Sequence, residues 1–431
     1  MTYHTMRTSH SILTDGEKME QYEQAVQAIE HCMLQFETVH ICPPGLLAVV
    51  RLANGESVVY QHQHTASDKP QIQRLSPPDF LKQYPLFDAV LPQGGPKNTL
   101  LFSPSFWASA VAQKEVNIPP VLDDMAQIIG PKAFVYDRQD QQKIAKTLKR
   151  QTACIVNAKT IADSGILAAA ATFGRAFTAV LVLEKAAQVF LQGSLLGGAA
   201  SISKLDAVVM HFGYLMGYSK KAASVVHQTA TEFRREIPAK ELELRSKIVE
   251  LGQQLTKDNL VQGTWGNISV RLDKAHFLCT PSGLAYDSIT PYDIVRVELD
   301  TLEWEGRLKP TAEKNLHAAL LNQHKDVQCI IHAHPVLCSV FAATRRDMNV
   351  KGWPEEQLLG ASVPVAAYGF PTSKSLCKNT AAAIQENRAC LLANHGMVAC
   401  GQSMADAYEK AMALERAAGA LLQALADGEK G

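Results

Sequence analysis

The sequence predicts an α/β protein made of two tandem domains, each with a central β-sheet flanked by helices. Short apolar runs such as Ala389–Leu392 have the length of strands, and longer ones such as Ser403–Leu422 have the length of helices. The two kinds alternate along the chain, which favours layers of helices packed on sheets. A chain of 431 residues is also too long for one ordinary domain, so two domains are expected.

Similar segments recur in the same order in the two halves of the chain, which indicates an internal duplication rather than a chance likeness of apolar segments. The three pairs of similar segments are Leu100–Trp107 with Ile330–Leu337, Ala153–Gly165 with Ala389–Gly401, and Leu183–Ala187 with Leu414–Ala418. The boundary between the halves is expected in a charged stretch that contains Pro238. We therefore predict a first domain over residues 1–228, a linker over residues 229–240 and a second domain over residues 241–431.

The charge balance excludes several kinds of partner. Lysine plus arginine number 42 and aspartate plus glutamate number 42, so the formal net charge is zero. Such a chain has no electrostatic reason to bind nucleic acid or an anionic membrane surface. The expected partners are a small-molecule substrate and other copies of the same chain.

The apolar and cysteine patterns predict a cytoplasmic protein. Residues Met1–Lys18 are polar and lack the apolar core of a signal peptide. Ile166–Leu183 is the most apolar stretch, but Arg175 interrupts it, so we expect a buried helix rather than a membrane span. The nine cysteines form no C-x-x-C pair, which is typical of a reduced compartment.

His332 and His334 form an H-x-H pair inside the apolar run Cys329–Pro335. Residues two apart on a strand point to the same face, so both imidazoles can approach one ion. An isolated H-x-H pair is more often two hydrogen-bonded histidines at a sheet edge.

A third histidine, His395, favours a metal site. It follows the short strand predicted over Ala389–Leu392, in a turn where Gly396 allows the backbone to bend sharply. Three neutral imidazoles with an open coordination position suit a catalytic divalent ion, which would polarise a carbonyl and stabilise an enediolate.

Glu313 is the carboxylate expected to act with this ion. Pro310 and Thr311 favour a helix start, which would put Glu313 in the first turn. A first-turn glutamate is often only a capping-box acid, but beside three histidines it becomes a candidate general acid/base. His317, one turn further on, is either a residue behind the metal ligands or a core residue.

Two turn-rich segments, Gly263–Ser269 and Thr280–Gly283, offer backbone N–H groups and small polar side chains. Such loops can hold an anion without a lysine. No glycine-rich nucleotide loop is evident, so neither a nicotinamide cofactor nor ATP is expected.

Taken in order, the motifs GTWGNIS, TPSG, KPTAE, HAHP and NHG resemble those of the class II aldolase/adducin family, which includes fuculose-phosphate aldolase. The resemblance covers about Glu250–Ala418. It implies an α/β domain, active sites between neighbouring domains of a four-domain ring, and a bound metal, usually zinc, with Mn²⁺ or Co²⁺ as alternatives. It implies that His332, His334 and His395 are the metal ligands and Glu313 the acid/base. The substrate-phosphate contacts that it implies are Gly266, Asn267, Ser282, Gly283 and Thr311.

Two positions depart from the pattern of the sugar-phosphate aldolases. Those enzymes usually have two adjacent serines before the glutamate, where this chain has Thr311 and Ala312, so one hydroxyl is missing. They also use a tyrosine to protonate the departing aldehyde oxygen, and that position falls near Trp353. The ribulose-phosphate epimerases of the family carry aspartate in place of Glu313, and the adducins lose metal-binding histidines that this chain keeps.

The first half lacks the metal ligands and is predicted to bind no catalytic metal. The residues that align with His332, His334 and His395 are Phe102, Pro104 and Lys159. A separate H-x-H pair, His62 and His64, lies in a polar run and is predicted to be a solvated loop. We expect the inert half to form the second wall of each live site, in a homodimer whose four domains form a ring.

The leading hypothesis is a metal-dependent carbon–carbon lyase of the aldolase type. It would act on a small hydroxy-ketone, such as a sugar phosphate or sugar acid, through a metal-stabilised enediolate. A decarboxylase or dehydratase of the same family is the first alternative. A non-catalytic, adducin-like scaffold is the alternative from another class.

Overall fold

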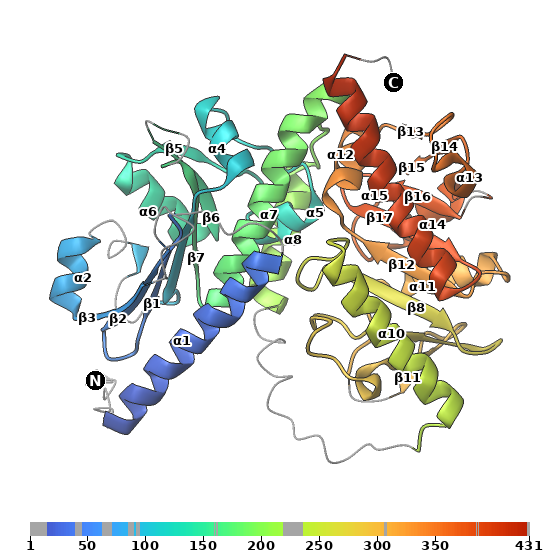
Figure 1. The fold of residues 1–431 in the computed structure, drawn as a ribbon, viewed down its shortest axis with the longest axis horizontal. Helices are drawn as coiled ribbons and strands as arrows, with labels where there is room; N and C mark the ends of the chain where they lie inside the picture. The colour runs from blue at the N-terminus through green and yellow to red at the C-terminus, as the bar shows by residue number, and fades with distance from the viewer. Residues whose placement is uncertain are drawn as a thin grey trace, which may run out of the picture. The chain divides into compact units, whose positions relative to one another are not determined.

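The computed structural model describes residues 15–38, 45–62, 71–84, 90–91, 95–158, 160, 163–218, 236–305, 308–384, 386 and 388–428 (Figure 1). The chain divides into two compact units. The first comprises Met1–Gln113 with Val135–Val180, and the second comprises Lys114–Phe134 with Leu181–Gly431. These units differ from the domains expected over residues 1–228 and 241–431, because Lys114–Phe134 and the chain from Leu181 onward pack with the second sheet. Most of the expected linker lies outside the described residues.

The first unit contains a seven-stranded sheet with the strand order β3-β2-β1-β4-β7-β6-β5. Its strands are β1 (Leu47–Arg51), β2 (Ser57–Gln61), β3 (Gln71–Leu75), β4 (Thr99–Ser103), β5 (Val135–Asp137), β6 (Ala153–Asn157) and β7 (Gly165–Ala170). Neighbouring strands are antiparallel, except for the parallel pair of β5 and β6. The helices are α1 (Asp15–Thr38), α2 (Pro77–Gln83), α4 (Phe106–Gln113), α6 (Gln141–Arg150) and the start of α7 (Phe173–Gln192). The core lies where Phe80 of α2 and Leu148 of α6 pack with Leu100 and Leu167 of the sheet.

The second unit contains an eight-stranded sheet with the order β11-β10-β9-β8-β12-β17-β16-β15. Its strands are β8 (Gly266–Arg271), β9 (His276–Cys279), β10 (Val295–Glu298), β11 (Trp304–Glu305), β12 (Cys329–Ala333), β15 (Val365–Ala366), β16 (Ala389–Leu392) and β17 (Gly396–Gly401). Only β15 and β16 pair in parallel. A separate two-stranded sheet joins β13 (Met348–Asn349) to β14 (Ser362–Val363).

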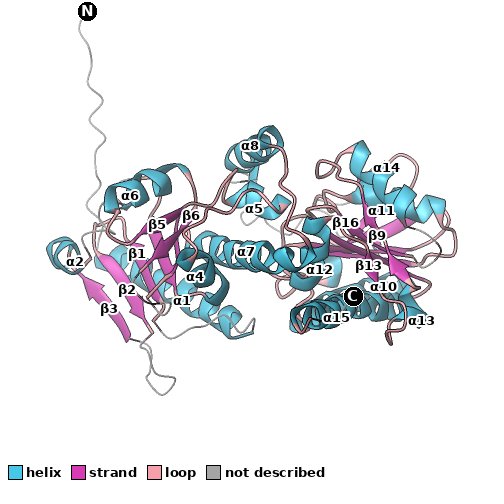
Figure 2. Ribbon diagram, turned by 90° about the horizontal axis from the view of Figure 1, so that it is seen from above, coloured by secondary structure: helices cyan, strands magenta, loops and turns pink. Residues whose placement is uncertain are grey.

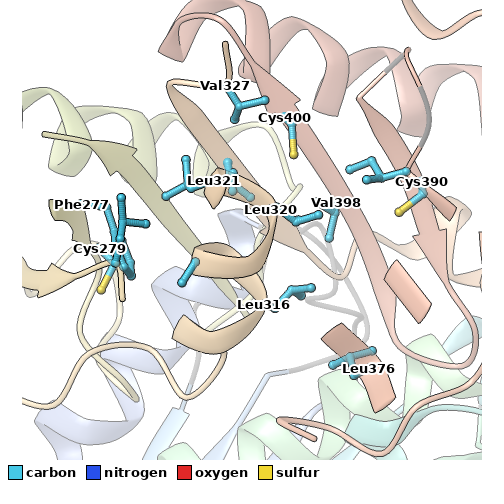
Figure 3. Close-up of a cluster of buried hydrophobic side chains, with 14 of the residues drawn as sticks. Phe277, Cys279, Leu316, Leu320, Leu321, Val327, Leu376, Cys390, Val398 and Cys400 are labelled. Carbon is cyan, nitrogen blue, oxygen red and sulfur yellow. The ribbon is translucent and has the colours of Figure 1, made fainter. Parts of the chain in front are cut away.

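Helices cover both faces of the second sheet (Figure 2). One face carries α11 (Lys314–Gln323) and α14 (Lys374–Ala383); the other carries α10 (Ala239–Lys257), α12 (Val336–Thr344) and α15 (Met404–Ala426). The remaining elements are α5 (Asp123–Ile128), η1 (Gly193–Leu196), α8 (Lys204–Gly213), η2 (Tyr214–Tyr218), η3 (Pro291–Asp293) and α13 (Glu356–Leu359). Leu316 and Leu320 of α11 and Leu376 of α14 pack against Phe277 and Val398 of the sheet (Figure 3), which fixes α11 beside the strands that carry the histidines.

The two sheets share one pairing pattern. Counted from the parallel pair, the first reads β5-β6-β7-β4-β1-β2-β3, and the second reads β15-β16-β17-β12-β8-β9-β10 before its additional edge strand β11. Ser103 pairs with Ile166 in the first sheet as Ala333 pairs with Met397 in the second. In this register Phe102 occupies the place of His332, as the sequence alignment has it.

Gly165 and Gly396 occupy equivalent places at the starts of β7 and β17, so the sequence alignment, which matched Gly165 with Gly401, is wrong at this end. A Cβ atom at Gly165 would lie 2.3 Å from the carbonyl oxygen of Ser103, and one at Gly396 would lie 2.4 Å from that of Ala333. Any side chain would therefore push two paired strands apart.

Gly165→Ala is expected to lower the free energy of unfolding by about 1–3 kcal/mol, since backbone atoms cannot yield as a flexible side chain can. Denaturant unfolding measures the loss. Gly174→Ala in α7 is the matched control, because nothing lies within 4 Å of a Cβ there; it is expected to be neutral or slightly stabilising. Equal effects of the two substitutions would contradict the steric account.

Ile166–Leu183 does not form the single buried helix that the sequence predicts, so that prediction is wrong. Strand β7 ends at Ala170 and α7 begins at Phe173. Every residue of β7 is buried, and a strand covered on both faces is as uniformly apolar as a buried helix. Among the described residues one helix, Phe173–Leu196, is long and apolar enough to cross a membrane, and 61% of its most apolar window is buried, as in the core helix of a soluble protein.

Candidate metal centre

His332 and His334 lie at the end of β12, which runs between β8 and β17 in the middle of the second sheet. Their spacing of two residues puts both rings on one side of the strand, as predicted. The two ring centroids are 4.8 Å apart and the two Nε2 atoms are 2.9 Å apart. His332 is completely buried, and the His334 side chain is 10% exposed.

His395 brings a third imidazole to the same point from the turn between β16 and β17. Its Nε2 atom lies 3.1 Å from that of His332. The ligand atoms of all three histidines lie within 4.8 Å of one another, as the sequence predicts. The turn, however, bends at Asn394, which has a left-handed φ of 60°, and not at Gly396. Glycine is needed at 396 because β17 starts directly against the carbonyl of Ala333.

Glu313 faces this point from the start of α11. It stands at the cap position, one residue before the helix rather than in its first turn. Its Oε2 atom lies 3.0 Å from His332 Nε2, and its Oε1 atom lies 3.1 Å from His395 Nε2. Burial alone would raise the pKa of Glu313, but the imidazoles of His332 and His395 hold that pKa well below its usual range. Glu313 is therefore an ionised carboxylate.

A chain of hydrogen bonds holds this carboxylate in place. The Asn267 amide donates to Glu313 Oε2 over 3.1 Å, and its Oδ1 accepts from His317 Nε2. His317 is completely buried, and burial lowers its pKa to about 3, so the ring is neutral. The structure thus puts His317 behind the site rather than only in the core. It also commits one N–H of the Asn267 amide, which is predicted to contact phosphate, to Glu313.

The predicted substrate loops lie side by side. Pro281 and Pro310 form a β-bridge, so Ser282 and Gly283 come close to Thr311. The backbone N–H of Ser282 donates to Lys309 O and that of Thr311 donates to Thr280 O. These two N–H groups are therefore not available to an anion, and of the expected backbone cradle this removes the N–H of Ser282.

Two further predicted positions complete this edge of the site. Gly266 pairs with Ala333, next to His332, and has a positive φ of 149°. The Thr311 hydroxyl accepts from the Glu313 N–H over 3.2 Å. Trp353, where the aldolase tyrosine falls, lies between β13 and α13.

Three buried charged residues from the N-terminal half of the chain also reach this centre, and sequence reasoning missed them. Asp123 Oδ2 lies 2.7 Å from His395 Nδ1. Asp124 forms an ion pair with Lys185, and its Oδ2 atom is 3.9 Å from His334 Nδ1. The available signal was an adjacent acidic pair inside an apolar run, which is rare unless the acids are paired.

The tautomers of two histidines show why these atoms fit a metal ion. His332 Nδ1 lies 2.8 Å from the carbonyl oxygen of Met397, which can only accept a hydrogen bond. His395 Nδ1 faces the Asp123 carboxylate in the same way. In the neutral rings both protons are therefore on Nδ1, and the Nε2 lone pairs face each other and Glu313. Lone pairs packed so closely repel unless a cation lies between them.

The charges around the imidazoles also favour a bound cation. Among the described residues that contact the three rings or each other, three are carboxylates: Glu313, Asp123 and Asp124. One ammonium, that of Lys185, faces them, which leaves two net negative charges. Buried charge of one sign is costly, and a divalent cation would balance it. Burial alone would lower the pKa of His395, but the Glu313 and Asp123 carboxylates raise it, so this point favours positive charge.

In the first sheet the corresponding place carries no imidazole among the described residues. Phe102 and Pro104 occupy the positions of His332 and His334. Lys159 and His64 lie outside the described residues, and the residue directly before Gly165 is the buried Ser164. That the first half binds no catalytic metal stays a prediction.

The part of the chain that resembles known proteins lies in the second unit. Residues 246–422 match the family described as Class II Aldolase and Adducin N-terminal domain. The chain is 32% identical over 182 residues to a 5-methylthioribulose-1-phosphate/5-deoxyribulose-1-phosphate aldolase of Rhodospirillum rubrum, a match that covers 42% of this chain and 81% of that protein. It is 31% identical over 157 residues to the L-fuculose phosphate aldolase of Escherichia coli, covering 36% of this chain and 72% of that protein. A solved L-fuculose 1-phosphate aldolase aligns with a TM-score of 0.42 and 31% identity, covering 43% of this chain and 88% of that one.

Proposed function

Because this chain belongs to the class II aldolase and adducin family, we propose that it is a metal-dependent carbon–carbon lyase whose substrate is a small phosphorylated ketose. The proposal rests on one observation. Three imidazole nitrogens and one carboxylate lie together, and their lone pairs are directed at one another. His332, His334 and His395 would hold the ion. Zinc is the first choice, because three histidines and one open position are typical of catalytic zinc; Mn²⁺ or Co²⁺ are alternatives.

The metal ion would supply Lewis-acid polarisation of the substrate carbonyl. Glu313 is the group that moves the proton. In retro-aldol cleavage the carbon–carbon bond breaks, its electrons stay on the ketone fragment, and the hydroxyl proton of the departing fragment is removed as that fragment becomes an aldehyde. A proton is then delivered to the carbon of the ketone fragment. The chain from His317 through Asn267 keeps the Glu313 carboxylate oriented for these transfers.

The choice of a phosphorylated substrate rests on the relatives, which are aldolases of sugar phosphates. Gly266, Asn267, Ser282, Gly283 and Thr311 remain the proposed contacts of that substrate. Ala312, at the place of a second hydroxyl, would leave the phosphate with one donor fewer. A sugar acid is therefore the alternative substrate.

Decarboxylation or dehydration is the second candidate reaction, favoured by Trp353 at the position of the aldolase tyrosine. An indole has no ionisable hydroxyl to take the hydroxyl proton of the departing fragment during cleavage or to return it in the reverse reaction. A non-catalytic scaffold is the third candidate, and the complete set of histidines together with Glu313 argues against it.

Incubation of the zinc-loaded protein with a panel of phosphorylated ketoses and ketoacids tests these candidates, with products identified by NMR. Release of an aldehyde supports the lyase. Loss of carbon dioxide or water without an aldehyde would move the assignment to the second candidate. A folded protein that binds no metal would favour the scaffold.

We also propose that the two units arose by duplication and that the intact protein is a homodimer. The shared pairing order of the two sheets and the equivalent glycines support the duplication. An apolar face on α8 supports the dimer: Leu205, Val208 and Phe212 are 73%, 50% and 62% exposed, while Ala207 and Met210 on the other face pack beneath it. A second copy of the chain would remove this surface from water.

The homodimer has a direct test in solution. Sedimentation should give twice the 47.0 kDa chain mass, and Phe212→Glu should shift the protein to the chain mass by placing a charge in the apolar face. Lys204→Glu, a like acid at an exposed position beside that face, should leave the dimer intact. A wild-type monomer would refute the dimer, and a dimeric Phe212→Glu protein would refute the role of α8.

A further inference from the structure

We propose that Asp123 is a positioning residue of the metal centre, which holds His395 in the tautomer whose Nε2 lone pair faces the ion. This inference rests on the proposed metal-dependent function and adds to it a residue from the opposite half of the sequence. It concerns Asp123 alone, because the neighbouring Asp124 has a different partner.

The contact between Asp123 and His395 has the geometry of a strong, charge-assisted hydrogen bond. Asp123 Oδ2 and His395 Nδ1 are 2.7 Å apart, and the two residues are 1% and 4% exposed. An ionised carboxylate only accepts, so the proton of the neutral ring is held on Nδ1. Nε2 is then free of a proton and can donate its lone pair to a metal.

Asn394, the residue before His395, holds Asp123 in place through hydrogen bonds. The Asn394 carbonyl accepts from the Asp123 N–H over 2.9 Å. The Asn394 amide donates to Val121 O over 2.9 Å and to Ala200 O over 2.6 Å, while Arg345 donates to its Oδ1. One completely buried side chain therefore ties two loops of the N-terminal half to the turn that carries a metal ligand. The carboxylate and the imidazole are thus fixed by the same turn.

Asp124, the neighbour of Asp123, has a different partner, so the role proposed for Asp123 does not extend to it. Its carboxylate is paired with Lys185, and it lies 3.9 Å from His334 Nδ1, beyond hydrogen-bond distance. Asp124 thus anchors α5 through an ion pair, whereas Asp123 directs its carboxylate at a ligand. The other oxygen of Asp123 is 3.4 Å from the Tyr368 hydroxyl, which donates to it.

Asp123→Asn is expected to weaken zinc binding about 10–100-fold, the usual effect of removing the partner behind a ligating histidine. An amide can turn its NH₂ group toward the ring and favour the proton on Nε2, where it blocks the lone pair. Asp123→Glu keeps the carboxylate and should recover part of the affinity. Asp287→Asn is the matched control, since it removes one exposed carboxylate elsewhere in the same unit and should leave the affinity unchanged.

The experiment measures zinc affinity of the purified protein by competition with a chromogenic chelator, together with the thermal midpoint of each variant. ¹⁵N NMR of histidine-labelled protein reports which ring nitrogen of His395 carries the proton. A general loss of packing would not move that proton from one nitrogen to the other. The expected result for the zinc-loaded wild type is a proton on Nδ1 only, with a larger share of that proton on Nε2 in Asp123→Asn.

The outcomes separate this inference from the function on which it rests. A folded wild-type protein that binds no zinc overturns both. Stoichiometric zinc in the wild type, with equal affinity in Asp123→Asn, overturns only the role of Asp123. If Asp123→Asn fails to fold, the NMR spectrum of the zinc-loaded wild type still decides, because a His395 ring with its proton on Nε2 and zinc on Nδ1 would refute the inference.

Discussion

Replacement of Glu313 by glutamine is expected to lower kcat by about 10²–10⁴-fold while the bound metal is retained. The amide has nearly the same shape, and its carbonyl oxygen can still accept from Asn267. It cannot take up a proton at neutral pH, however, so the step assigned to Glu313 fails. Steady-state kinetics on the best substrate of the panel and metal analysis of the same sample give the two readouts.

The control for this substitution is Glu303→Gln, which makes the same chemical change at an exposed position of the same unit. It should leave kcat and metal content unchanged. Retention of full activity by Glu313→Gln would refute its role as the acid/base. Loss of the metal together with activity would instead make Glu313 a ligand, since its carboxylate touches both His332 and His395.

His334→Ala is expected to abolish stoichiometric metal binding and, with it, turnover. Two imidazoles that remain cannot supply the ligand set of a catalytic zinc site. His334 is the best of the three for this test, because 10% of its side chain is exposed, against 0% for His332 and 4% for His395, so its removal disturbs the packing least. Metal content by mass spectrometry and kcat/KM check the expectation.

The same substitution should lower thermal stability to that of the chelator-treated wild type. A ligand present at 1,000 times its Kd stabilises the folded state by about 4.1 kcal/mol, and both treatments remove that term. His276→Ala, at a partly exposed histidine paired with Asp273, should keep the metal. One ion per chain in His334→Ala would rule out the proposed ligand set.

Short-range patterns in the sequence were enough to predict the elements that carry the three ligands. The runs around His332 and His395 are strands β12 and β16, and Ser403–Leu422 lies in α15 with its cap. Residue spacing on a strand decides which side chains share a face, so the approach of His332 to His334 follows from local geometry. The order of five motifs then identified the family.

Apolar content alone could not separate strand from helix in Ile166–Leu183, because a strand buried on both faces loses the alternation that marks most strands. Because the backbone bends at Asn394, the bend that the sequence predicted for Gly396 was wrong. The importance of Gly396 comes from the carbonyl of Ala333 on a strand distant in sequence, and only pairing of the strands reveals that contact.

The sequence by itself was enough to predict the α/β class and the meeting of the three histidines with Glu313. The tertiary structure alone decided what stands behind them: Asn267 and His317 behind Glu313, Asp123 behind His395, and Lys185 paired with Asp124. The physical reason is that strand and helix periodicity act over a few residues, whereas a buried charge takes whichever partner the packing brings within reach. That partner can come from anywhere in the chain: Asn267 and His317 lie in the same half as Glu313, whereas Asp123 and Lys185 lie in the N-terminal half.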